Sequence, residues 1–180
     1  MFRDLVEAMK TTIWQQLDVL LRNTTPVLVT LCMVIVSVMP LRLPEANFVM
    51  PMLTLMSVYF WSLHRTDLLP ATAVFAIGLF LDILTGLPLG LNAFILLGVF
   101  GLCVTQRRFF YNKSFAVIWW GFMVVAAAAM LIEWILMSIY LETLVSPKPI
   151  YFRYFLTVAL YPPIAWLFVR IQRSLPQETV

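Results

Sequence analysis

Apolar residues occur along this chain in six long runs, which short polar segments separate. The runs cover residues 26–43, 48–64, 68–85, 89–105, 114–141 and 150–171. A helix needs roughly 17–25 predominantly apolar residues to cross a bilayer. The pattern therefore predicts an all-α integral membrane protein with six transmembrane helices. A five-span arrangement, in which residues 78–105 are partly re-entrant, is the alternative topology.

The first 24 residues follow a different pattern. Apolar residues recur there at helical spacing, and charged or amide side chains occupy most other positions. This indicates an amphipathic cytoplasmic helix over 1–24, ahead of a transmembrane domain over 25–173 and a cytoplasmic tail over 174–180. Such a helix can lie on the membrane surface with its basic side chains near anionic headgroups, or it can bind a cytoplasmic partner.

Composition and charge support this arrangement. Hydrophobic residues make up 62% of the 180 residues and charged residues 12%, which is about half the charged fraction of a soluble domain. With six spans, nine Lys and Arg residues fall on the side of the two termini and three on the other side. The positive-inside rule then places both termini in the cytoplasm. The net charge of +3 reflects this topology and does not indicate binding to nucleic acid.

Two acidic residues lie within predicted spans, Asp82 in the third and Glu133 in the fifth. A charge at the bilayer centre costs roughly 2.5–3.5 kcal/mol on insertion scales, so such residues usually have a role. Small residues share a helical face with each acid, which favours a helix–helix contact there. Nearby basic residues are limited to Arg42 and Arg153 at the outer boundary. The acids could be structural anchors, a proton or ion pathway, or a docking point for another membrane protein.

The stretch after Asp82 contains turn-forming residues. We expect a tight turn in which Gly86 ends the third helix and Pro88 begins the first turn of the fourth, with Gly90 close behind. Burial disfavours a charged carboxyl, so we expect Asp82 to be protonated or strongly hydrogen-bonded to backbone groups freed where the third helix ends. Asparagine at position 82 should then retain function, whereas leucine should lose it.

Signatures of catalysis are absent from the sequence. The single histidine, His64, stands beside Arg65 and Asp67 in a predicted loop, which argues against a zinc site. No nucleophile elbow, phosphate-binding loop or dinucleotide fingerprint is present. We therefore expect no enzymatic activity, no cofactor and no metal.

Three stretches of the chain resemble the bacterial rod shape-determining protein MreD family. They are the turn with Gly78, Asp82, Gly86 and Pro88-Leu89-Gly90; the segment YFWSLHR at 59–65; and Leu160-Tyr161-Pro162, followed by Arg170 and Arg173. The size, the number of spans and the inside termini also agree, so the resemblance covers essentially the whole chain. The long charged N-terminal segment departs from the family's pattern and leaves the role of residues 1–24 open.

The resemblance implies a multi-pass protein of the bacterial inner membrane without catalytic residues. Its expected partner is the bitopic protein MreC and, indirectly, the actin-like MreB, a membrane glycosyltransferase and a penicillin-binding transpeptidase. The favoured function is a non-catalytic scaffold for rod shape and lateral peptidoglycan synthesis. Candidate residues for structural or partner contact are Gly78, Asp82, Gly86, Pro88, Gly90 and Glu133. The family is also similar in predicted fold to the substrate-binding subunits of vitamin importers, so such a subunit is the main alternative. A membrane-embedded enzyme acting on a lipid is another.

Overall fold

The computed structural model describes residues 24–39, 50–110, 113–143 and 147–174. Within these residues the elements are helix Thr24–Val38, α2 (Leu53–His64), the short 3₁₀ helix η1 (Thr66–Leu68), α3 (Ala71–Thr85), α4 (Leu91–Phe110), α5 (Phe115–Tyr140) and α6 (Lys148–Ser174). All of them are helical, which confirms the all-α prediction. The predicted amphipathic helix and C-terminal tail lie outside the described residues, except for residues 24 and 174.

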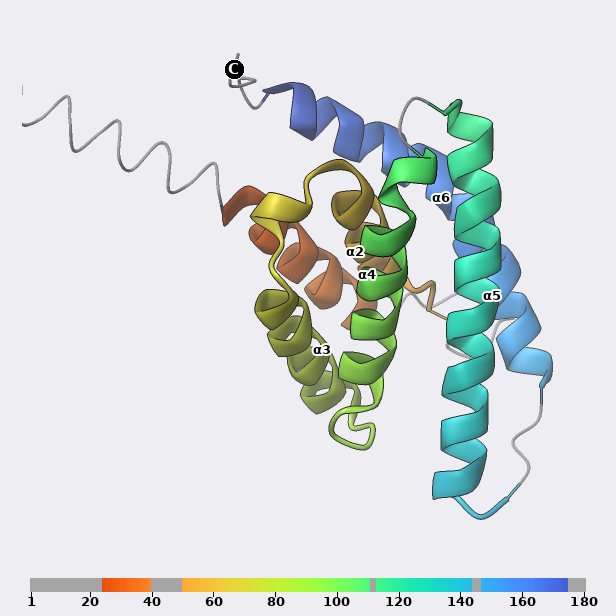
Figure 1. Cartoon of the computed structure of the whole chain (residues 1–180). Coiled ribbons are helices and arrows are strands. Elements are labelled where there is room, and N and C mark those ends of the chain that lie inside the picture. Colours follow the sequence, from red (N-terminus) through yellow and green to blue (C-terminus); the bar gives the residue numbers. More distant parts are fainter. Residues whose placement is uncertain (1–23, 40–49, 111–112, 144–146, 175–180) are drawn as a thin grey trace, which may run out of the picture.

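The helices run alternately in opposite directions along one bundle (Figure 1). α3 and α4 lie side by side and are joined by a short turn, while α5 pairs with α6. As a result, α2, α4 and α6 all finish at the same end of the molecule, where α3 and α5 begin (Figure 1). This alternation agrees with the order of the predicted spans.

Two of the described helices, α5 and α6, are long and apolar enough to cross a membrane by themselves. α2 has 12 residues and α3 has 15, which at a rise of 1.5 Å per residue gives about 18 and 22 Å, less than the roughly 30 Å of a hydrocarbon core. Both helices begin later than the predicted runs 48–64 and 68–85. Pro51 lies before α2 and Pro70 lies at the N-cap of α3 in an extended conformation, because proline lacks the N–H that a helix interior requires. Six complete spans are therefore not established.

α2 is the centre of the bundle. All residues from Leu53 to Leu63 are buried, and a helix that is covered on every side belongs to the core whatever its length. Tyr59 packs edge-on against Phe122 of α5 and Tyr161 of α6, with ring centroids 5.2 and 5.9 Å apart. The hydroxyl of Tyr59 also donates to the carbonyl of Ile118 at 2.9 Å. The stretches around residues 59 and 161, which both carry the family resemblance, therefore meet in the core.

α6 continues through Pro162 and Pro163. Pro162 has no N–H, so the carbonyl of Val158 loses its helical donor. The indole N–H of Trp119 on α5 donates to this carbonyl at 3.3 Å, so a neighbouring helix supplies the missing donor. Beyond the prolines α6 turns away from α5 and leans across the end of the bundle (Figure 1).

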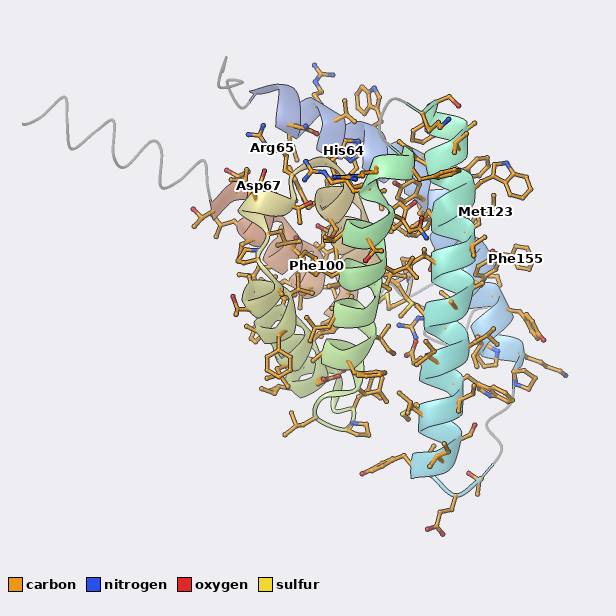
Figure 2. All side chains as sticks on the ribbon, viewed as in Figure 1. His64, Arg65, Asp67, Phe100, Met123 and Phe155 are labelled. Atoms are coloured by element: carbon orange, nitrogen blue, oxygen red, sulfur yellow. The ribbon has the colours of Figure 1, made fainter. Side chains whose placement is uncertain are left out.

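The outer faces of α5 and α6 are strongly apolar. Trp120, Val124 and Phe155 are each 67% exposed, and Ile139 is 69% exposed. Phe155 points away from the other helices (Figure 2). Soluble monomers rarely leave a contiguous apolar surface of this kind in water. Lipid tails would remove the cost of exposing it, which agrees with the membrane assignment.

Candidate functional site

α3 and α4 approach each other very closely at Gly78. A Cβ atom added to Gly78 would lie 2.3 Å from the Cα of Ala93 and 2.7 Å from its backbone nitrogen. These are backbone atoms, which cannot rotate aside, so the contact requires glycine. Asp82 lies one helical turn after Gly78 on the same face of α3. The close contact therefore brings the Asp82 side chain to the beginning of α4.

The turn between α3 and α4 uses two glycines in left-handed conformations. Gly86 has φ +68° and follows the last residue of α3, and Gly90 has φ +99° just before α4. The N–H groups of Gly86 and Leu87 both donate to the main-chain carbonyl of Asp82, the latter at 3.2 Å. The prediction that Gly86 ends the third helix is confirmed. Pro88, predicted in the first turn of the next helix, instead lies in the turn before α4 begins at Leu91.

The carboxyl group of Asp82 is fully buried and accepts three hydrogen bonds. Its Oδ2 atom accepts the N–H of Gly90 at 2.9 Å. Its Oδ1 atom accepts both the backbone N–H and the side-chain amide of Asn92, each at 2.9 Å. The first N–H groups of a helix have no acceptor within the helix. Asp82 on α3 therefore caps α4, and the sign of a carboxylate suits the positive end of the helix dipole.

The prediction that the Asp82 side chain binds backbone groups at the end of α3 was wrong. The backbone groups where α3 ends are satisfied by the Asp82 carbonyl and by the hydroxyl of Thr85, which donates to the carbonyl of Leu81 at 2.8 Å. The side chain of Asp82 is directed to the start of the next helix instead. The sequence shows that a buried acid precedes a turn, but it does not show which side of the turn folds over the carboxyl group.

Glu133 on α5 forms an ion pair with Arg153 on α6, with 2.8 Å between Oε1 and Nη1. The Nε–H of Arg153 also donates to the carbonyl of Met50 at 3.1 Å. One turn along α6, the hydroxyl of Thr157 accepts the N–H of Met52 at 3.2 Å. These contacts join α5, α6 and the segment that leads into α2. Of the two basic residues that the sequence offered, Arg153 is the partner, and Arg42 lies outside the described residues.

Within the described residues no hydrogen bond or ion pair joins Asp82 to Glu133, but the partners of both acids line one cavity of about 320 Å³. Asn92 and Arg153 form polar parts of its wall, and Thr54 lies there with a buried hydroxyl that has no hydrogen-bond partner among the described residues. The ends of helix Thr24–Val38 and of α3 complete the wall. Sequence reasoning did not single out Thr54 or Arg153 as site residues, because neither belongs to a local motif.

The geometry around His64 is structural. Its Nδ1 atom lies 2.9 Å from the carbonyl of Phe60, and its ring stacks on the Phe60 ring with centroids 4.2 Å apart. In the part of the chain that the structure describes, no three His, Cys, Asp or Glu side chains gather as a metal site would require. The polar groups described above cap a helix, form an ion pair between helices and line a cavity.

Comparison with known proteins gives one match. The model of a protein family described as rod shape-determining protein MreD matches residues 18–171. No curated protein and no solved structure matches the chain.

Proposed function

Since the chain belongs to the MreD family of rod shape-determining membrane proteins, we propose that it is a non-catalytic inner-membrane scaffold that holds MreC for lateral peptidoglycan synthesis. MreB, a membrane glycosyltransferase and a penicillin-binding transpeptidase would be reached indirectly through MreC. The observation that carries the proposal is the buried Asp82 carboxyl group, which binds three donors at the start of α4. Its bonds are all internal, so it serves to fix the relative position of two helices.

A scaffold needs surfaces whose shape is set before the partner arrives. The Gly78 contact and the Asp82 cap hold α3 against α4. The Glu133–Arg153 pair holds α5 against α6 and against the segment before α2. Between lipid tails, helices associate through close packing and not through the hydrophobic effect. Rigid helix pairs with exposed apolar faces are therefore suited to receive the single transmembrane helix of a bitopic protein.

Depletion of this protein from its host should make rod-shaped cells round or swollen. The physical reason is that the synthesis enzymes would lose the membrane component that positions them along the lateral wall. Cell width and length, measured by microscopy during depletion, test the expectation, with a plasmid-borne wild-type copy as the control. Normal rods under complete depletion, in a host without a second copy, would remove the scaffold proposal.

A second candidate function is the binding of a small molecule, as in the vitamin-importer subunits that the family resembles in predicted fold. The observation in its favour is the cavity of about 320 Å³ with Arg153, Asn92 and the hydroxyl of Thr54, which has no hydrogen-bond partner in the described part of the chain. A scaffold does not require an occupant there, whereas a substrate-binding subunit does.

Purification from native membranes should separate the two functions. We expect MreC to be recovered with the protein and native mass spectrometry to detect no small molecule bound to it. Thr54→Val keeps the size of the side chain but removes the hydroxyl, so it should leave the recovery of MreC unchanged. A retained solute that Thr54→Val releases, in a preparation without MreC, would support the importer subunit instead.

A further inference from the structure

The described charged side chains are distributed unequally between the two ends of the bundle. The end at which α2, α4 and α6 finish carries five cationic residues and one acidic residue, whereas the opposite end carries two cationic and three acidic residues. We call the first the basic end; its members are Arg65, Arg107, Arg108, Lys113, Arg170 and Asp67. Figure 2 shows Arg65 and Asp67 at this end, beside His64. The sequence predicts that it faces the cytoplasm.

Exposed aromatic rings lie beside two of the cations at this end. The ammonium group of Lys113 lies 5.7 Å from the ring centre of Phe109, and the guanidinium group of Arg170 lies 5.4 Å from that of Trp166. Both rings are more than half exposed. Exposed aromatic rings and snorkelling cations occur together at membrane interfaces, where the ring meets the upper acyl region and the charge reaches the headgroups.

Three of these cations are not neutralised within the described part of the chain. Arg107, Arg108 and Lys113 form no ion pair among the described residues. The two arginines lie in the last turn of α4, and Lys113 lies just before α5. Arg108 and Lys113 are exposed and Arg107 is half-buried, within electrostatic range of His64. Cations without an acidic partner in the described part of the chain are available to bind an anion from outside it.

We propose that the basic end binds the headgroups of anionic phospholipids such as phosphatidylglycerol. An arginine can bind two phosphate oxygens at once, and lysine adds a point charge. An acidic protein would also offer anions. The exposed rings of Phe109 and Trp166 favour the lipid, because apolar surface directly beside the cations suits a molecule that carries acyl chains next to its charge.

Lipid retention by the full-length protein tests the proposal. The purified protein is equilibrated with mixed micelles that contain equal amounts of phosphatidylglycerol and phosphatidylcholine, and the lipids that it retains are measured by mass spectrometry. A basic side chain near an anionic lipid surface contributes about fivefold in affinity. Arg108→Gln should therefore lower the retained ratio of phosphatidylglycerol to phosphatidylcholine about fivefold, and Arg107→Gln/Arg108→Gln/Lys113→Gln on the order of a hundredfold if the effects add. Raising the salt concentration should lower the wild-type ratio.

Lys148→Gln is the matched control for Arg108→Gln, because it removes one exposed cation from the opposite end. It should leave the ratio unchanged. An equal loss in both variants would overturn the proposal by showing that only net charge matters. Equal retention of the two lipids by the wild type would also overturn it and would leave an acidic protein as the partner for this end. Thermal unfolding followed by tryptophan fluorescence checks that each variant is folded. If the triple variant does not fold, the lipid ratio of Arg108→Gln alone tests the proposal.

Discussion

Replacing Gly78 by alanine is expected to push α3 away from α4 and to lower the midpoint of thermal unfolding markedly. The added Cβ would lie 2.3 Å from the Cα of Ala93, so one of the two helix backbones has to move. Overpacking typically costs about 1–3 kcal/mol, and a backbone clash belongs at the upper end of that range. The displacement would also move Asp82 away from the N–H groups that it caps. Unfolding of the purified protein and its level in the membrane measure the effect.

Gly98 and Gly101 on α4 supply the controls for this experiment. A Cβ at either position meets no atom of the described residues within 4 Å beyond the neighbouring backbone of α4 itself. Alanine is favoured over glycine inside a helix by about 1 kcal/mol. Gly98→Ala and Gly101→Ala should therefore be as stable as the wild type or slightly more stable. If Gly78→Ala unfolds at the same temperature as Gly98→Ala, the close contact between α3 and α4 is wrong.

The hydrophobic pattern predicts the helical class, because helix periodicity depends on local rules. Gly86 ends α3 as expected, since a left-handed residue stops a helix wherever it occurs. The length of the apolar run at 48–64 does not predict the environment of α2. A continuous apolar run of that size fits either a membrane span or a buried helix, and the burial of all residues from Leu53 to Leu63 shows that α2 is covered by its neighbours.

The polar contacts were less predictable because they join segments that are distant in sequence. Glu133 and Arg153 are 20 residues apart and meet only because α5 and α6 pair along their lengths. Arg153 and Met50 are separated by 103 residues. No spacing rule connects such positions. The polar residues of the cavity wall, Thr54, Asn92 and Arg153, come from three different helices. The cavity could not be predicted from the sequence for the same reason.

The geometry at Asp82 revises what the sequence alone predicts for asparagine. Both carboxyl oxygens are in use: Oδ1 accepts two hydrogen bonds and Oδ2 accepts one. The side-chain amide of asparagine has only one acceptor oxygen. If that oxygen keeps the two bonds from Asn92, the NH₂ group faces the N–H of Gly90, and two donors then meet. Asp82→Asn should therefore be destabilised by about 1–3 kcal/mol, the usual effect of one buried polar group left unsatisfied.

Asp82→Leu should be affected far more severely, because it leaves three donors at the start of α4 without an acceptor, each at about 1–3 kcal/mol. We expect little folded protein in the membrane and no rescue of rod shape in depleted cells. Asn92→Ala removes only the side-chain donor and keeps both backbone bonds, so it should lie near the wild type. Asp67→Asn, an exposed acid at the other end of the bundle, should behave as the wild type.

The order of stability distinguishes a structural cap from a proton pathway. A cap predicts that unfolding temperature and rod-shape rescue fall together from the wild type through Asp82→Asn to Asp82→Leu. A pathway requires a group that releases protons, so it predicts an Asp82→Asn protein that is as stable as the wild type but fails to restore rods. Thermal unfolding of each purified variant, paired with microscopy of the same variant in depleted cells, gives both quantities. An Asp82→Leu protein that unfolds at the wild-type temperature would show that the three bonds do not hold α4 in place, and the cap would have to be abandoned.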